Sequence, residues 1–289
     1  MGLRGPQTWG VRVVDEQSSE RILHSVLDAG INFIDTAPDY GVCEERIGKY
    51  LSSRRGDFYL ATKCGCNAVQ HDDHLEIRHT FTKDTIQRNI ELSLQRLQTS
   101  YIDLLQFHGG EAAKIKEAGL IDLLKDYQSQ GVIGYLGVST SLPNLPGFVD
   151  LNLFDSIQVP YSCLSPEHEP WLARIASTGA GIIIRGATAQ GGPEASIQRP
   201  ALNLIWERAR LSDLLPDGMK PTELILRYTL SHRHCDTAIV GTCSEQHLFE
   251  NIAAANAGPL PPSLYSQFTT AIEAAIASSS PLGKECLRD

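Results

Sequence analysis

Short apolar runs that alternate with longer amphipathic stretches constrain the fold of this chain more than any other feature. The runs predict buried strands, at residues 32–35, 58–62, 102–107, 132–138, 155–160, 181–185 and 237–240. Stretches with helical spacing lie between them, at 19–29, 43–54, 83–98, 117–130, 169–178, 221–231 and 245–256. This alternation is typical of parallel strands joined by right-handed helical crossovers.

Seven visible strand–helix units, with an eighth strand expected near "TWGVRVV", favour an α/β fold of the (β/α)8 TIM barrel type. An open doubly wound sheet is the alternative that the pattern alone leaves open. No linker or shift in composition divides the chain, so we expect a single barrel domain over residues 1–289.

Composition narrows the class of partner. The chain has 34 acidic and 25 basic side chains and a formal net charge of −9, which argues against a nucleic-acid or anionic-membrane partner. No run of about 18 apolar residues and no signal-peptide pattern is present. The seven cysteines are odd in number and scattered, as expected for reduced thiols. We therefore expect a cytoplasmic protein with a small-molecule partner. The oligomeric state cannot be inferred from the sequence.

The segment "KCGCNAVQHDDH" raises the question of a metal site, because Cys64, Cys66, His71 and His74 lie close together in it. Structural zinc sites usually pair ligands two to four residues apart, and this C-x-C has no second cysteine pair nearby. We therefore expect no metal site here and interpret the segment as a polar surface loop.

Ionisable residues follow three successive predicted strands. The first strand is followed by Asp35 and, after a turn, Tyr40; the second by Lys63; the third by His108. In a barrel of parallel strands the active site forms at the carboxyl ends of the strands. Each residue alone is a weak signal, because an aspartate there can cap a turn and a lysine can be a solvated charge. Together they predict one cluster.

These residue types form a chemically coherent set. A phenol has an ordinary pKa of about 10, and a nearby ammonium lowers it because opposite charge favours the ionised form. A carboxylate paired with the lysine keeps the ammonium charged and oriented in a partly dry pocket. An imidazole beside them holds or polarises a carbonyl oxygen. The set is a proton donor with an oxyanion pocket that lacks only a source of hydride.

The chain resembles the aldo-keto reductase superfamily in five segments in order, over roughly residues 9–256. They are "FIDTAPDYG", "LATKCG", "LQRLQTSYIDLLQFHG", "GYLGVST" and "IVGTCSEQHLFENIAAA". The resemblance implies a (β/α)8 barrel that binds NADPH or NADH in extended form. It also implies a catalytic tetrad of Asp35, Tyr40, Lys63 and His108, in which Tyr40 is the general acid, Asp35 and Lys63 tune it and His108 orients the substrate. Trp9 is then expected in the wall of the substrate pocket.

The same resemblance implies the cofactor contacts. Ser139 and Gln158 lie where the family binds the carboxamide, while Glu250 and Asn251 lie near the adenine. Gly241 and Thr242 precede a helix for which Ser244 is the expected N-cap, and backbone N–H groups at such a helix start hold phosphate. Arg185 is expected near a cofactor phosphate or a substrate carboxylate, with a structural ion pair as the alternative.

The chain departs from its family at two places. Many relatives have Lys at the Gly241 position and Arg at the His247 position, and both cations bind the adenosine 2′-phosphate. This chain has neither cation. NADPH is still the expected cofactor, and NADH or dual use is the alternative. The start "MGLRGPQTWG" is too short for both a first strand and the hairpin that usually closes the barrel bottom. We therefore expect a shortened N-terminus without that hairpin, unless the chain is incomplete there.

The predicted function is an NAD(P)(H)-dependent oxidoreductase that interconverts an aldehyde or ketone with an alcohol. The polar segment "HDDHLEIRHT" mildly favours a hydroxylated or sugar-like substrate. A non-catalytic cofactor-binding regulatory or sensor subunit on the same fold is the alternative. The identity of the substrate and the physiological direction cannot be read from the sequence.

Overall fold

The structure is a computed structural model that describes residues 3, 14–71, 75–193 and 200–278. Its contacts divide the chain into two compact units. The first unit comprises residues 1–158, 174–181 and 241–248, and the second comprises residues 159–173, 182–240 and 249–289. The expectation of a single domain over residues 1–289 stays a prediction.

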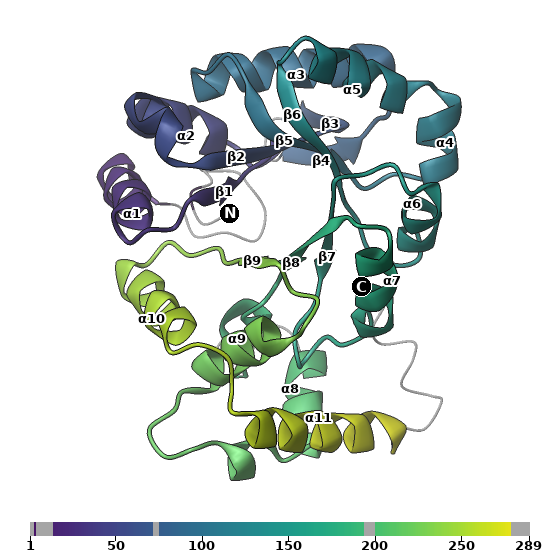
Figure 1. Cartoon of the computed structure of the whole chain (residues 1–289). Coiled ribbons are helices and arrows are strands. Elements are labelled where there is room, and N and C mark those ends of the chain that lie inside the picture. Colours follow the sequence, from purple (N-terminus) through teal and green to yellow (C-terminus); the bar gives the residue numbers. More distant parts are fainter. Residues whose placement is uncertain (1–2, 4–13, 72–74, 194–199, 279–289) are drawn as a thin grey trace. The chain divides into compact units, whose positions relative to one another are not determined.

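Seven parallel strands follow one another in chain order within the described residues (Figure 1). They are β1 (Phe33–Asp35), β2 (Tyr59–Cys64), β5 (Ile102–His108), β6 (Ile133–Ser139), β7 (Ser156–Pro160), β8 (Gly181–Arg185) and β9 (Thr237–Ile239). A doubly wound sheet reverses its strand order near the middle, and this order never reverses. All seven expected strands are confirmed. The expected eighth strand and the shortened N-terminus fall at residues 1–14, most of which lie outside the described residues.

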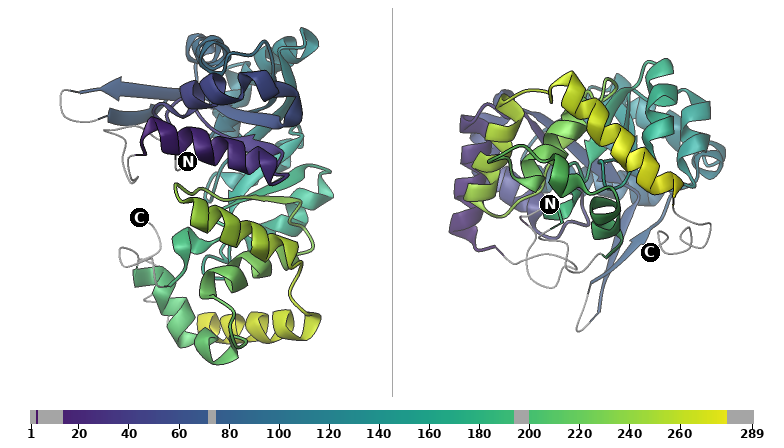
Figure 2. Two further views of the ribbon diagram at one scale, coloured as in Figure 1. Left: turned by 90° about the vertical axis from the view of Figure 1, so that its left-hand side faces the viewer. Right: turned by 90° about the horizontal axis from the view of Figure 1, so that it is seen from below.

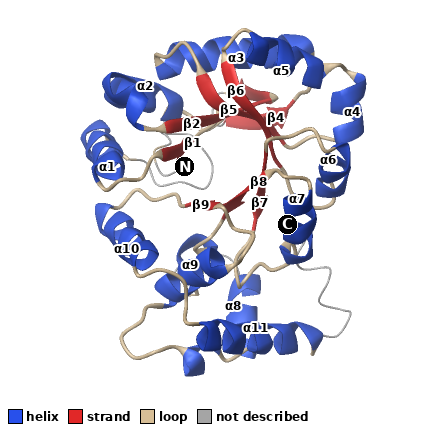
Figure 3. Cartoon of the chain, viewed as in Figure 1, coloured by secondary structure: helices blue, strands red, loops and turns tan. Residues whose placement is uncertain are grey.

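Most of the helices lie between the strands in sequence, whereas α1 precedes β1 and α10 and α11 follow β9; those of the first unit cover the outer side of β1, β2, β5 and β6 (Figure 3). The helices are α1 (Glu16–Asp28), α2 (Cys43–Leu51), α3 (Lys83–Leu97), α4 (Ala112–Glu117), α5 (Leu120–Ser129), α6 (Leu145–Leu151), α7 (Glu169–Ser177), α8 (Pro200–Arg208), α9 (Pro221–Ser231), α10 (Glu245–Asn256) and α11 (Pro262–Ala277). Short 3-10 helices lie at η1 (Ser52–Asp57), η2 (Ala189–Gly191) and η3 (Leu211–Leu214). All seven expected helices are present, and α4, α6, α8 and α11 were not expected.

Helix α3 forms as its sequence predicts. The hydroxyl of Thr82 accepts a hydrogen bond from the backbone N–H of Thr85, which caps the first turn. Ile86, Ile90 and Leu97 lie buried on one side of the helix. Gly48 of α2 lies so close to α3 that a Cβ added to it would meet the backbone oxygen of Arg96 at 2.1 Å. Only glycine permits this approach of the two helices.

The segment interpreted from the sequence as a polar surface loop is instead a two-stranded antiparallel hairpin. Its strands are β3 (Cys66–Gln70) and β4 (Leu75–His79), and the register pairs Cys66 directly with His79. In Figure 2 the hairpin, drawn in blue, projects beyond the helices of the first unit. The pairing brings two residues that are 13 positions apart onto one end of the hairpin, and this contact could not be read from helical or strand periodicity.

A buried carboxylate, Glu44, joins α2 to its neighbours. Its Oε1 accepts hydrogen bonds of 2.7 Å from the hydroxyls of Thr62 and Ser93, and Oε2 lies 3.6 Å from the guanidinium of Arg96. Burial raises the pKa of Glu44 despite these partners. A folded-state pKa above the unfolded-state value means that the stability contributed by this group is greatest at acid pH and is lost as the pH rises.

We expect Glu44→Gln to raise the unfolding midpoint at pH 8. The amide oxygen still accepts from Thr62 and Ser93, while the cost of burying a charge is removed. Arg96 keeps its ion pair with Glu45. The gain should shrink as the pH is lowered toward 5. Urea unfolding at several pH values measures it, with Glu20→Gln, at an exposed glutamate of α1, as the control. A loss of stability at pH 8 would contradict the interpretation.

Candidate active site

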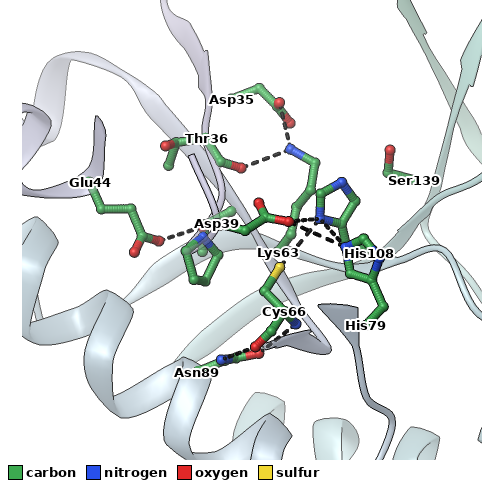
Figure 4. A network of polar contacts seen from close by, with 12 residues as sticks. Asp35, Thr36, Asp39, Glu44, Lys63, Cys66, His79, Asn89, His108 and Ser139 are labelled. Carbon is green, nitrogen blue, oxygen red and sulfur yellow. Dashed lines mark hydrogen bonds and ion pairs between the residues drawn. The ribbon is translucent and has the colours of Figure 1, made fainter. Parts of the chain in front are cut away.

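The candidate site lies in the first unit, where β1, β2 and β5 end (Figure 4). Lys63 lies at its centre and its side chain is fully buried. Its ammonium donates to Asp35 Oδ2 at 2.7 Å and to the backbone oxygen of Thr36 at 2.8 Å. Burial alone would lower the pKa of Lys63, but the charge and hydrogen bond of Asp35, together with the charges of Tyr40 and Asp39, outweigh burial and raise it. The lysine therefore stays a cation at neutral pH.

The carboxylate of Asp35 is held on its other side by two amides. Gln106 Nε2 and Gln158 Nε2 each donate to Asp35 Oδ1 at 3.0 Å. The hydroxyl of Ser139 in turn donates to Gln158 Oε1 at 2.8 Å. The two residues expected at the carboxamide end of the cofactor, Ser139 and Gln158, are thus joined to Asp35 by a continuous chain of hydrogen bonds.

Tyr40 lies next to Lys63, in the turn that precedes α2. The ammonium of Lys63 lies 4.9 Å from the centre of the Tyr40 ring, and the Tyr40 ring meets the imidazole of His108 edge-on with centroids 5.9 Å apart. Tyr40 is 9% exposed. The four residues expected from three separate strand ends therefore lie together.

His108 ends β5, and its Nδ1 lies 3.2 Å from Oδ2 of Asp39. Burial lowers the pKa of His108, although the Asp39 carboxylate opposes the shift. Burial would conversely raise the pKa of Asp39, but hydrogen bonds from His108 and His79 outweigh it and hold that pKa below its usual value. A buried carboxylate thus faces two imidazoles beside Tyr40.

Four residues around this cluster were not predicted from the sequence as part of it: Asp39, Cys66, His79 and Gln106. Asp39 directly precedes Tyr40, and Gln106 precedes His108 by two positions on one strand, so the alternation of strand side chains places Gln106 on the same face. That alternation was a signal in the sequence for Gln106. Cys66 and His79 reach the site only through the hairpin pairing.

The remaining candidates lie in other parts of the molecule. Gly241, Thr242 and His247 belong to a segment of the first unit at the start of α10, where Ser244 Oγ accepts from the backbone N–H of His247 at 3.3 Å and confirms the expected N-cap. Glu250, Asn251 and Arg185 belong to the second unit, where Glu250 pairs with Lys220 at 2.8 Å. Trp9 lies outside the described residues.

The side chains weighed from the sequence as metal ligands, and not expected to form a site, lie as follows. Cys64 is fully buried, His71 contacts Glu76 of the hairpin at 3.1 Å, and His74 lies outside the described residues. No helix within the described residues is both long and apolar enough to cross a membrane.

Comparison of the sequence with known proteins shows to which family the chain belongs. Residues 3–273 match the model of the Aldo/keto reductase family. The chain is 32% identical to the uncharacterized oxidoreductase YqkF of Bacillus subtilis over 255 residues, which cover 82% of this chain and 81% of the relative. It is 28% identical to L-galactose dehydrogenase of Arabidopsis thaliana over 264 residues, 83% of this chain and 79% of the relative.

The fold of the chain also matches the solved structure of an aldo-keto reductase. The holo form of aldo-keto reductase AKR11C1 from Bacillus halodurans matches with a TM-score of 0.78 and 30% identity, over 94% of this chain and 91% of that one. The expected (β/α)8 TIM barrel class is thereby confirmed. The strand order, the buried lysine–aspartate pair and these matches agree that the chain belongs to the aldo-keto reductase family of oxidoreductases, which interconvert carbonyls and alcohols.

Proposed function

We propose that this protein is an NAD(P)(H)-dependent oxidoreductase in which Tyr40 gives a proton to the carbonyl oxygen during reduction and removes it during oxidation. The observation that supports the proposal is the fully buried Lys63–Asp35 ion pair, whose ammonium lies 4.9 Å from the ring centre of Tyr40. A fixed positive charge so close to a phenol stabilises the phenolate that remains after proton transfer.

The neighbouring residues divide the other tasks. Asp35, held by two glutamine amides, keeps the ammonium charged and in place. His108, whose pKa burial lowers, is neutral near pH 7 and suits hydrogen bonding to a substrate oxygen better than proton release. The nicotinamide cofactor supplies hydride when bound.

The described residues fit such a cofactor. A helix start whose first N–H groups have no partner within the helix suits a phosphate, and α10 begins in this way at Glu245, three residues after Thr242. Ser139 and Gln158 present a hydroxyl and an amide beside Asp35 for the carboxamide. We retain Glu250 and Asn251 as adenine contacts, Arg185 as an anion contact and Trp9 as a pocket residue, as the family resemblance assigns them.

NADPH is the proposed cofactor, with NADH or dual use as the alternative, because neither Gly241 nor His247 supplies a permanent cation for the 2′-phosphate. We expect His247→Arg to tighten NADPH binding about tenfold, as one charge-assisted hydrogen bond to phosphate allows. NADH lacks that phosphate and serves as the internal control. Fluorescence titration with both cofactors measures the effect, and equal tightening for NADH would show that residue 247 does not face the 2′-phosphate.

For the substrate we propose a hydroxylated, sugar-like carbonyl or alcohol. The observation that favours it is the cluster of polar side chains beside Tyr40, where His108, His79 and Asp39 lie together. The Arabidopsis relative is named for its action on L-galactose. Turnover on a panel of sugars, simple aldehydes and ketones, after titration with NADPH and NADH, tests the function. A protein that binds cofactor but turns over none of the panel would instead be the regulatory or sensor subunit.

We also propose a single-domain cytoplasmic enzyme. Six cysteines lie in the described residues, and all six are free thiols, as is usual in a reducing compartment.

A further inference from the structure

Four side chains with metal-binding atoms converge beside the candidate tetrad (Figure 4). They are Asp39 from the turn before α2, Cys66 from the start of β3, His79 from the end of β4 and His108 from the end of β5. One ligand atom of each lies within 4.8 Å of the ligand atoms of the other three. Of these four, only His108 belongs to the candidate tetrad, while Asp39 and His79 lie in the polar cluster beside Tyr40.

The distances among three of these atoms form a nearly equilateral triangle. Asp39 Oδ2 lies 3.2 Å from His108 Nδ1 and 3.3 Å from His79 Nε2, and the two ring nitrogens are 3.2 Å apart. Cys66 Sγ lies 3.3 Å from His108 Nδ1 and within 4.8 Å of the other two atoms. His108 Nδ1 thus has three polar neighbours at contact distance.

A hydrogen-bond network does not account for this arrangement. A ring nitrogen has either one N–H or one lone pair, so Nδ1 of His108 can bond well to only one of its three neighbours. Mutual contact among several potential ligand atoms is instead the arrangement found around a bound cation.

A second observation concerns Asp39 alone. The residue is 4% exposed, yet its Oδ1 has no hydrogen-bond partner in the structure. A buried carboxylate oxygen without a partner is costly, and this carboxylate is aimed at the centre of the cluster through its other oxygen. A nearby divalent ion compensates such a carboxylate.

We propose that Asp39, Cys66, His79 and His108 form a binding site for Zn²⁺. Zinc prefers four tetrahedral ligands drawn from cysteine sulfur, histidine nitrogen and carboxylate oxygen, at bond lengths that place neighbouring ligand atoms roughly 3.3–3.6 Å apart. The four contacts of 3.2–3.3 Å among these atoms come close to those edges. The mixture of one sulfur, two nitrogens and one oxygen is unsuited to Mg²⁺ or Ca²⁺, which take oxygen ligands.

The surrounding backbone holds the ligands in position. The amide of Asn89, on α3, brackets Cys66: its Oδ1 accepts from the backbone N–H of Cys66 and its Nδ2 donates to the backbone oxygen, both at 2.9 Å. The hairpin register places His79 directly opposite Cys66. Supports of this kind orient metal ligands in known sites. The His79 side chain is 35% exposed, so an ion can reach the buried ligands from solvent beside it.

Zinc at this site binds the imidazole of His108, which the proposed function assigns to hydrogen bonding with the substrate. The effect of zinc on the substrate therefore rests on the proposed function. With Nδ1 of His108 bound to the metal, the ring proton is confined to Nε2. Figure 4 shows that second nitrogen pointing away from the cluster. The site therefore links zinc occupancy to the hydrogen-bonding state of His108, while zinc binding itself is measured without any turnover.

The test is a titration of the chelator-treated full chain with Zn²⁺ in competition with a chromophoric chelator. We expect one tight equivalent in the wild type, and affinity at least tenfold lower in Cys66→Ser and in His79→Gln. The matched controls, Cys243→Ser and His71→Gln, should bind as the wild type does. His71 lies on the same hairpin but contacts Glu76.

Cobalt provides a second readout of the same ligands. Co²⁺ in the wild type should show a thiolate charge-transfer band that is absent in Cys66→Ser and present in Cys243→Ser. Thermal melts verify folding, and the partly exposed His79 offers a variant that perturbs the core little. Wild-type affinity in both Cys66→Ser and His79→Gln, or no tight equivalent in the wild type, would overturn the proposal.

Discussion

Tyr40→Phe is expected to lower kcat by roughly 10²- to 10⁴-fold, the range over which a positioned general acid contributes. The substitution removes only the hydroxyl, so the ring keeps its contact with Lys63 and its edge-on contact with His108. Binding of NADPH should stay within about twofold of wild type, since a lost proton donor changes the chemical step more than cofactor binding. Steady-state kinetics and a fluorescence titration measure the two quantities.

The matched control is Tyr59→Phe, which removes the same hydroxyl from a tyrosine of β2 that is 56% exposed. It should leave kcat unchanged. Turnover of Tyr40→Phe within tenfold of wild type would remove the assigned role of Tyr40 while leaving the family membership intact. The result also separates the enzyme from the sensor alternative, which predicts no turnover to lose.

The strands and the proximity of Asp35, Tyr40, Lys63 and His108 could be predicted because their signals are local. Each strand is a short apolar run bounded by polar residues, and Asp35, Lys63 and His108 lie at or next to the ends of three such runs. Parallel strands bring their carboxyl ends to one edge, so the sequence order alone indicates that these residues meet.

The zinc-site residues could not be predicted because their proximity depends on long-range pairing. Cys66 and His79 are 13 positions apart, and only the register of the hairpin brings them opposite each other. The segment between them is polar and its alternation is weak, so we interpreted it as a loop. Helix α6 was missed for a different reason: Pro146 and Gly147 suggest a turn, although proline is well tolerated in the first turn of a helix.

The second large effect is expected for Lys63→Met. Methionine fills a similar volume but leaves Oδ2 of Asp35 without its cation in a site where that side chain is only 4% exposed. Breaking a buried ion pair on one side typically costs about 3–5 kcal/mol, and we expect a loss of unfolding free energy of that order together with a large drop in kcat. Urea unfolding and steady-state kinetics measure the two.

The double variant Lys63→Met/Asp35→Asn separates stability from chemistry. Neutralising the stranded carboxylate should restore most of the lost stability, while kcat stays low because the cation beside Tyr40 is still absent. Since the pKa of Lys63 is raised, the stability from its charge is fully present below the ordinary lysine pKa of 10.5 and is lost only as the pH rises beyond it. Hence Lys63 itself should add no pH dependence to the unfolding free energy of the wild type between pH 6 and 9. A variant as stable as wild type at pH 7 would show that the pair is not held as two buried charges.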